Sequence, residues 1–561
     1  MWGVLHSFAN KGHIMELSSY NKRSCEVLVI GGGGAGLCAA IRAREAGADV
    51  LLVSKFRAGY GNNTILSKAT FSVTNVWPDP RDTPGAMVDD TLKGGRYIND
   101  PELVATVADG AGDLVEFLER RGVRLIRQKG QLAAISAPGH AIARHARVKH
   151  ASGRGIIVPL LTHAHEIGVR FAHQIFVTRI LKTKEGHIAG AVGFNPDGKL
   201  FAFMANSVVL ASGGFGQVYQ NTNNALGITG DGQGLAYDLG LPLKDMEFVQ
   251  FYPTAAGKKW TRIVLYEALI CGEKGVLRNA DGDDILAKHG LATTLTRDRL
   301  AQVIMAELLA GNGVAGGVTL DLSAVSAERL APYGSLLGDS TKKELVVSPT
   351  AHFCNGGVVI NARAETEVEG LFSAGEVCGG VHGANRLAGN ALTEAFVMGG
   401  LAGCAAARGA KGLGGPQIPE KELKAEKHRL DSLLTDTTSQ PLKGRFELKS
   451  VMWHKAGIVR NKSGLESVIG EIETIKHRIE THRVGSYIDL RALLELRNMT
   501  VTAKMVCRAA LMRSESRGCH HRSDFPHEID GNRRINIIIH RQGPQMMLQK
   551  TTAAGTGPKT A

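Results

Sequence analysis

Three glycines near the start of the chain have the spacing of a dinucleotide-binding turn. Gly31, Gly33 and Gly36 satisfy the pattern GxGxxG directly after the apolar run EVLVI. The first glycine permits a tight bend, the second lets a pyrophosphate approach the backbone, and the third lets helix and strand pack closely. The amides that open the following helix then face the phosphates. Glycine turns are common, and the position after a buried strand is what favours a nucleotide site here.

The elements that position this turn are predicted to be one strand–turn–helix–strand unit. Residues 26–30 form the first strand, Gly34 and Ala35 lead into the helical run LCAAIRAREAG, and ADVLLVSK forms a second strand. This strand ends in Ser54 and Lys55 rather than in the acid that would hold a ribose hydroxyl. A lysine there suits the 2′-phosphate of NADP or an ordinary surface position, and this segment leaves both open.

The length and pattern of the chain predict an α/β protein of several domains. Its 561 residues exceed what one hydrophobic core usually holds. We expect a Rossmann-type nucleotide-binding domain, interrupted by an α+β capping domain and followed by a helical domain. The predicted ranges are 25–244 and 351–415 for the two parts of the nucleotide-binding domain, 245–350 for the capping domain, 420–530 for the C-terminal helical domain and 541–561 for a disordered tail.

The composition excludes several other classes of protein. Lysine and arginine exceed aspartate and glutamate by 66 to 53, but this charge is spread out and aromatic residues make up only 5%. We therefore expect a solvated basic surface or an anionic substrate pocket, and no nucleic-acid partner. The eight cysteines form no CxxC pair and no iron–sulfur spacing, which predicts no metal site and scattered reduced thiols.

The sequence also predicts a cytoplasmic location. No run approaches the roughly 18 apolar residues that a transmembrane helix needs. The N-terminal segment lacks the apolar core and cleavage site of a secretory signal.

Five later motifs occur in a particular order, and together they carry a family resemblance. They are TGDGQGLAYDLG, MEFVQFYPT, AHFCNGGVVI, TEVEGLFSAGEVCGGVHGANRLAGNAL and LMRSESRGCHHRSDFP. In this order they resemble the flavoprotein subunit of succinate dehydrogenase and fumarate reductase, with L-aspartate oxidase as a close relative. The resemblance runs from about Cys25 to Asp530. In the last motif it implies a salt-bridged segment, through Arg513, Glu515, Arg517 and Arg522, that packs on the flavin domain.

The resemblance implies that the cofactor is FAD. Ser54 and Lys55 then occupy the strand end that meets the adenosine ribose, which removes the argument for NADP. A helix starting at Asn390 fits a flavin, because a helix N-terminus stabilises the negative charge of the reduced ring. Besides the glycine turn and this strand end, the implied FAD-binding positions are Asp231, Gly375, Glu376, Arg386, Asn390, Ala391 and Leu392.

The attachment of the flavin departs from the pattern of many relatives. Many dehydrogenases of this family attach FAD covalently through a histidine that precedes a threonine after the second strand. Here Asn63 precedes Thr64. The resemblance therefore implies that both residues contact FAD and that the cofactor is held without a covalent bond.

The substrate positions implied by the resemblance are two retained and two changed residues. His352 and Arg386 match the family, whose chemistry is hydride exchange between flavin N5 and a CH–CH or C=C carbon of a small carboxylate. Tyr252 stands where the family has a histidine, and Cys271 appears in place of its proton-donating arginine. Arginine suits carboxylate geometry, whereas tyrosine and cysteine carry no positive charge. We expect Tyr252 and Cys271 to line the pocket, with a substrate other than fumarate.

Several questions remain open at the level of sequence. Arg262 and Lys274 are either a displaced substrate charge or surface cations. L-aspartate oxidase is an alternative enzyme, and a non-catalytic FAD subunit for electron transfer is an alternative of another class. Electrons arrive from an iron–sulfur or other partner subunit, from a soluble donor or acceptor, or from the substrate itself. Such a partner would also place the chain at the inner face of a membrane.

Overall fold

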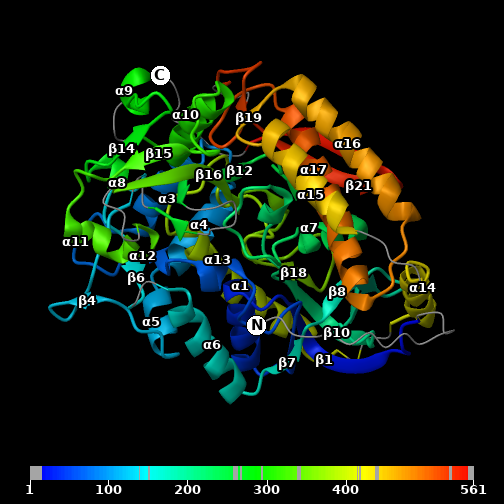
Figure 1. Ribbon diagram of the computed structural model, residues 1–561. Coiled ribbons are helices and arrows are strands. Elements are labelled where there is room, and N and C mark those ends of the chain that lie inside the picture. Colours follow the sequence, from blue (N-terminus) through cyan, green and yellow to red (C-terminus); the bar gives the residue numbers. More distant parts are fainter. Residues whose placement is uncertain are drawn as a thin grey trace.

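A seven-stranded sheet forms the centre of the molecule (Figure 1). The computed structural model describes residues 16–137, 139–149, 152–256, 263–265, 268–291, 295–337, 343–413, 415, 418–435, 441–529 and 534–553. The strand order is β7 (Arg170–His173), β2 (Val50–Ser54), β1 (Asn21–Ile30), β10 (Leu200–Leu210), β9 (Ile188–Phe194) and β8 (Phe176–Lys182), and β18 (Leu371–Ser373) also pairs with β10. The predicted strands 26–30 and 48–55 are β1 and β2, which pair in parallel.

Two helices pack tightly against each other beside this sheet. Helix α1 (Gly34–Glu45) follows the glycine turn, and α13 (Asn390–Ala410) is the long helix predicted from Asn390. A Cβ atom on Gly403 would lie only 2.1 Å from the carbonyl oxygen of Ala39, so glycine is required where the helices cross. This packing brings the starts of both helices to the same cavity, which Ala35 and Ala391 line.

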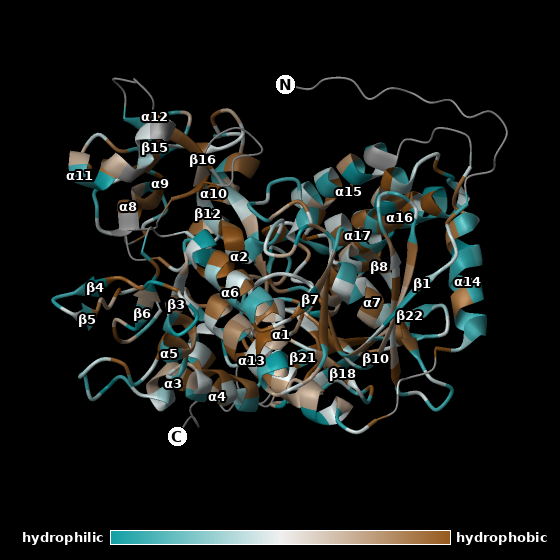
Figure 2. Cartoon of the chain, turned by 90° about the horizontal axis from the view of Figure 1, so that it is seen from below, coloured by the Kyte–Doolittle hydropathy of each residue, from teal (hydrophilic) through white to brown (hydrophobic). Residues whose placement is uncertain are grey.

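A second lobe lies above the central sheet and has a core of its own. Its sheet has the order β13 (Ile263–Val264), β12 (Val249–Ala256), β16 (Glu344–Cys354), β15 (Val318–Asp321) and β14 (Val276–Arg278). Helix α10 (Arg297–Leu309) buries Leu300 and Ile304 in a hydrophobic cluster that also contains Leu277, Leu320 and Val347. We call this lobe the cap, and in Figures 1 and 2 it lies on the opposite flank from the C-terminal helices.

Four helices make up most of the C-terminal region. They are α14 (Glu420–Asp431), α15 (Pro441–Lys455), α16 (Lys462–Thr481) and α17 (Tyr487–Met512). The helix α7 (Asp231–Leu239), which begins within the motif TGDGQGLAYDLG, packs against α17. The C-terminal helices therefore contact the domain that carries the glycine turn.

The tail that we predicted as disordered over 541–561 is ordered up to Thr552. Strands β21 (Ile535–Gln542) and β22 (Gln545–Thr552) form a hairpin, and β21 also pairs with β11 (Leu243–Lys244). The prediction was wrong here because the β-branched run INIII supplies strand propensity, and Gly543 adopts a positive φ of 58° in the turn. Residues 554–561 lie outside the described residues.

The arginine-rich motif near the C-terminus forms buried ion pairs. The Arg513 guanidinium bonds to Glu247 at 2.6 Å and to Glu515 at 2.9 Å, and it lies 3.4 Å from Asp245. Arg517 pairs with the same Glu515 at 2.9 Å. These contacts join the C-terminal segment to the residues just before β12, and Arg517 also donates to the carbonyl oxygen of Arg96 in the domain of the glycine turn at 3.3 Å.

The described part of the chain shows neither a membrane span nor a metal cluster. None of its helices combines the length and the apolar character needed to cross a bilayer. Nor do three or more histidine, cysteine, aspartate or glutamate side chains converge there in a geometry that would hold a metal ion.

Candidate functional site

One large cavity collects most of the residues predicted for the site. It has a volume of about 1480 Å³ and lies between the central sheet, the starts of α1 and α13, and the cap. Of the predicted residues, it is lined by Gly31, Gly33, Gly34, Ala35, Ser54, Lys55, Asn63, Thr64, Asp231, Tyr252, His352, Gly375, Glu376, Arg386, Ala391 and Leu392. A cavity of this size, extended between two helix N-termini, has room for a dinucleotide and a small substrate.

The structure explains the need for glycine differently at the three positions of the turn. Gly31 has a φ of +122°, and a Cβ atom on Gly36 would lie 1.9 Å from the carbonyl oxygen of Gly31. Both are therefore required by the protein's own packing. At Gly33 a Cβ atom would approach only Asn62, at an ordinary 3.6 Å, so packing does not require glycine there. Gly33 lines the cavity and begins α1 without a side-chain cap, which fits a phosphate lying against the backbone.

Lys55 is held by carboxylates rather than open to a phosphate. Its ammonium group lies 2.6 Å from Asp231 and 3.0 Å from Glu495, and it donates to Thr229 at 2.9 Å. Burial by itself would lower the pKa of Lys55, but these two carboxylates outweigh it and the pKa is raised. A 2′-phosphate here would meet the carboxylates of Asp231 and Glu495, which disfavours an NADP-type phosphate at Lys55.

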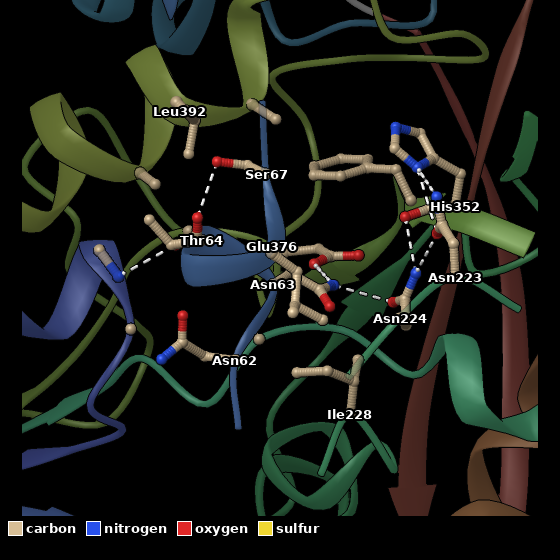
Figure 3. A pocket seen from close by; sticks show the side chains of 18 of the residues that line it. Asn62, Asn63, Thr64, Ser67, Asn223, Asn224, Ile228, His352, Glu376 and Leu392 are labelled. Carbon is tan, nitrogen blue, oxygen red and sulfur yellow. Dashed lines mark hydrogen bonds between the residues drawn. The ribbon is translucent and has the colours of Figure 1, made fainter. Parts of the chain in front are cut away.

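Asn63 and Glu376 meet at the middle of the cavity wall (Figure 3). The amide nitrogen of Asn63 donates to Glu376 at 3.1 Å, and the backbone amide of Cys354 donates to the same carboxyl group at 3.1 Å. Burial raises the pKa of Glu376 to about 7, against which these hydrogen bonds act in the opposite direction. Next to Asn63, the Thr64 hydroxyl accepts from the backbone amide of Gly34 at 3.1 Å.

Asn390 does not line the cavity, in contrast to our expectation that it contacts FAD. Its side chain is buried, accepts from Ser72 at 2.8 Å and donates to Thr91 at 3.0 Å. Both ends of the amide are therefore satisfied by the protein. Asn390 fixes the first turn of α13, while Ala391 and Leu392 reach the cavity.

His352, on the cap strand β16, and Arg386, in the segment before α13, line the same end of the cavity. The Arg386 guanidinium donates to Gln250 at 2.8 Å and lies 4.7 Å from the ring centre of Phe353. Burial, reinforced by Arg386, Arg297 and Lys68, holds the pKa of His352 well below its usual range. His352 is therefore a neutral imidazole next to a permanent cation.

Tyr252 contributes an aromatic wall at the same end. Its ring packs edge-on against that of His352, with 5.4 Å between the ring centres. The tyrosine hydroxyl donates to the carbonyl oxygen of Leu265. Because this donor is directed at the backbone, Tyr252 offers the cavity mainly its ring.

Arg297 is a functional candidate that the sequence reasoning missed. It is the first residue of α10 in the cap, lines the cavity, and places its guanidinium 5.1 Å from the centre of the Tyr252 ring. Lys68 also lines this end and donates to the carbonyl oxygen of Val264 at 2.7 Å. The only available signal for Arg297 was its place at a helix start in TRDRLAQ, which carries no chemistry by itself.

Of Cys271, Arg262 and Lys274, the structure describes the side chain of Lys274 alone. Cys271 ends the short helix α8 (Ala268–Cys271), but its side chain lies outside what the structure describes, as does Arg262. Lys274 is described and does not line the cavity.

The protein is similar to known flavoproteins over nearly its whole length. Residues 26–392 match a family described as FAD binding domain, and residues 445–554 match one described as fumarate reductase flavoprotein C-term. The chain is 34% identical to one of the subunits of fumarate reductase (CoM/CoB) from Methanothermobacter marburgensis over 540 residues, which are 93% of this chain and 98% of that one. It is 32% identical to L-aspartate oxidase of Acinetobacter baylyi over 531 residues, covering 89% and 93%.

Solved structures of related flavoproteins have the same overall fold as this chain. The FrdA chain of E. coli quinol fumarate reductase, in a mutated form, superposes with a TM-score of 0.89 at 28% identity, over 96% of this chain and 98% of that one. Sdh1 of Mycobacterium smegmatis superposes with a TM-score of 0.87 at 30% identity, covering 96% and 95%. The sequence resemblance and the predicted Rossmann-type fold are thereby confirmed.

Proposed function

This chain belongs to the family of FAD-dependent oxidoreductases that contains the fumarate reductase and succinate dehydrogenase flavoproteins and L-aspartate oxidase, and we propose that it interconverts the CH–CH and C=C forms of a small carboxylate. The observation that carries the proposal is the meeting of Arg386, His352 and Arg297 at one end of the FAD cavity. When bound, FAD supplies hydride exchange at its N5 atom.

The residues at this end have complementary tasks in the proposed reaction. Arg386 and Arg297 bind the carboxylate, because a planar guanidinium matches its geometry and withdraws charge from the adjacent double bond. The neutral His352 adds a hydrogen bond. Arg297, which approaches from the cap, is the proposed proton donor to the carbon that does not receive the hydride, and in the reverse direction it accepts that proton.

The proposed substrate is a carboxylate other than fumarate. The sequence suggested that two cations of the family were lost, at Tyr252 and Cys271. Arg297 supplies a cation in the same cavity, and the remaining ground is Tyr252, whose hydroxyl is occupied by Leu265. An aromatic wall at this place favours a substrate with one carboxylate and a less polar second end.

The proposed state of the cofactor is non-covalent. Asn63 has no nucleophilic atom, and its amide is engaged by Glu376, Asn224 and the backbone of Ala225. For electron supply we propose a second protein of a complex, since one relative is named as part of a fumarate reductase with several subunits and another as part of quinol fumarate reductase.

Anaerobic reoxidation of the photoreduced protein tests the proposed function. The flavin spectrum is followed after addition of fumarate, crotonate or cinnamate. We expect rapid reoxidation by at least one enoate and slower reoxidation by fumarate. Fastest reoxidation by fumarate would refute the changed substrate. In a parallel assay under air, formation of hydrogen peroxide and ammonia from L-aspartate would establish the oxidase instead. Reoxidation by no enoate, with fast exchange to a redox protein, would establish the electron-transfer role.

A further inference from the structure

Three asparagine side chains connect the cofactor region of the cavity with His352 (Figure 3). We propose that Asn63, Asn224 and Asn223 form one polarised chain of hydrogen bonds that fixes the tautomer of His352, so that its Nε2–H is the donor presented to the substrate. This inference rests on the proposed function only in naming a carboxylate as the acceptor. Asn223 and Asn224 are positioning residues in this scheme, since they act through His352.

The polarity of the chain starts at a backbone amide. The N–H of Ala225 donates to the side-chain oxygen of Asn63 at 3.0 Å, and a backbone N–H can only donate. The orientation of the Asn63 amide is thereby determined. Its nitrogen must point the other way, where it donates to Glu376 at 3.1 Å and to the side-chain oxygen of Asn224 at 2.9 Å.

The next link is oriented by two independent contacts. The oxygen of the Asn224 side chain is taken by Asn63, so its nitrogen faces the opposite side. There it donates to the carbonyl oxygen of His352 at 2.9 Å, which can only accept, and to the side-chain oxygen of Asn223 at 3.1 Å. Asn224 is almost fully buried, so water does not compete for these bonds.

The last link sets the proton on the histidine. Because the oxygen of Asn223 accepts from Asn224, its nitrogen faces His352, with 2.9 Å between Asn223 Nδ2 and His352 Nδ1. The oxygen of Asn223 is farther from the same ring nitrogen, at 3.3 Å. Nδ1 therefore accepts, and a neutral ring must carry its hydrogen on Nε2.

A residue of the C-terminal helices holds the backbone of this asparagine chain through a further hydrogen-bonded side chain. Lys449 of α15 donates to the side-chain oxygen of Gln217 at 2.7 Å, and the amide nitrogen of Gln217 donates to the carbonyl oxygen of Asn224 at 2.9 Å. The backbone that carries Asn223 and Asn224 is thus held by buried polar contacts. A chain of oriented donors on a fixed backbone is suited to set a tautomer, whereas general packing needs no particular polarity.

An inversion of polarity at Asn223 tests the inference. An Asn223→Asp side chain has two acceptors and no donor, so it requires a proton on His352 Nδ1. Nitrogen-15 NMR of the flavin-containing protein, labelled in its histidine rings, reports which nitrogen is protonated. The His352 signals are assigned by their loss in His352→Gln. We expect an unprotonated Nδ1 in the wild type and a protonated Nδ1 in Asn223→Asp, with no change in the matched control Asn206→Asp outside the cavity.

A kinetic measurement adds the functional consequence. With the fastest enoate, Asn223→Asp should raise KM by about 10- to 100-fold, the value of a lost hydrogen bond to a charged group, and change kcat less. Asn223→Ser retains a hydroxyl donor and should recover part of the loss. A protonated Nδ1 in the wild type, or a kcat loss without a change in KM, would overturn the inference. If no enoate reoxidises the wild type, the proposed function fails, while the NMR result still decides the tautomer.

Discussion

The guanidinium of Arg297 lies 5.1 Å from the centre of the Tyr252 ring, so that two elements of the cap meet at the substrate end of the cavity. Arg297 comes from the first turn of α10, and Tyr252 from β12. The contact is a cation–π arrangement. A positive charge is therefore present at the substrate end even though the family's histidine is replaced by Tyr252.

Removal of this charge should suppress turnover without removing the flavin. For Arg297→Met we expect the rate of flavin reoxidation by the best enoate to fall by about 10²- to 10⁴-fold, because a carboxylate ligand and the proposed proton donor are lost together. Stopped-flow absorbance measures the rate. Arg299→Met, an exposed position on the same helix, is the matched control and should retain the wild-type rate. Equal rates in all three proteins would remove Arg297 from the site.

Acid precipitation should release the flavin completely. Asn63 offers no atom for a covalent bond, so flavin fluorescence is expected in the supernatant and not in the protein pellet. Fluorescence that stays in the pellet would contradict non-covalent binding. Replacement by Asn63→Ala removes the hydrogen bonds to Glu376 and Asn224, and we expect weaker FAD binding by about 30-fold, from about 1 kcal/mol per lost bond. Fluorescence titration of FAD measures the change.

Loss of the buried cation Lys55 should destabilise the fold. Lys55→Met leaves the carboxylates of Asp231 and Glu495 without their shared partner, and breaking such a buried pair lowers the free energy of unfolding by about 3–5 kcal/mol. Denaturant unfolding at constant FAD concentration measures it. The control Lys22→Met breaks an exposed pair with Glu420 and should have little effect. Equal stability of both variants would show that Lys55 is dispensable.

Glu376 should make stability depend on pH near neutrality. Its folded pKa of about 7 lies above the ordinary glutamate value of 4.5, so the folded state holds its proton more tightly than the unfolded state. The contribution to stability is complete below about pH 4.5 and is lost as the pH rises through 7, by about 3 kcal/mol in total. Glu376→Gln removes this contribution, so the difference in unfolding free energy between wild type and variant should change between pH 5 and pH 8. A difference that is constant with pH would contradict the raised pKa.

The local parts of the site could be predicted from sequence, because they are determined by neighbouring residues. Gly31, Gly33 and Gly36 occupy one turn, and Asn63 and Thr64 occupy one loop. Arg297 was missed because its place depends on how α10 packs against β12 within the cap, and a long stretch of sequence separates these two elements. The family resemblance instead pointed to Cys271, which stands where relatives have the proton-donating arginine.

The asparagine chain and the C-terminal hairpin also depend on contacts between residues that are far apart in the sequence. Asn63 and Asn224 are separated by 161 residues, and Asn223 and His352 by 129. Asparagine is common in loops, so only three-dimensional contact distinguishes these three side chains. In the hairpin, the short run INIII follows a long helical region, and its partner strand β11 lies far upstream, which pattern reading within a local window does not connect.

The pairing of β21 with β11 also has a consequence for biosynthesis. Ile537 donates its backbone amide to Asp245, a residue made 292 positions earlier. At the usual 5–20 residues per second, the ribosome needs about 15–60 s to make this intervening stretch. During that time β11 has an open edge, and Asp245 lacks the partner it bonds in the finished protein. A nascent chain of this protein therefore carries an unpaired strand edge at the start of its cap until the C-terminal hairpin has been made.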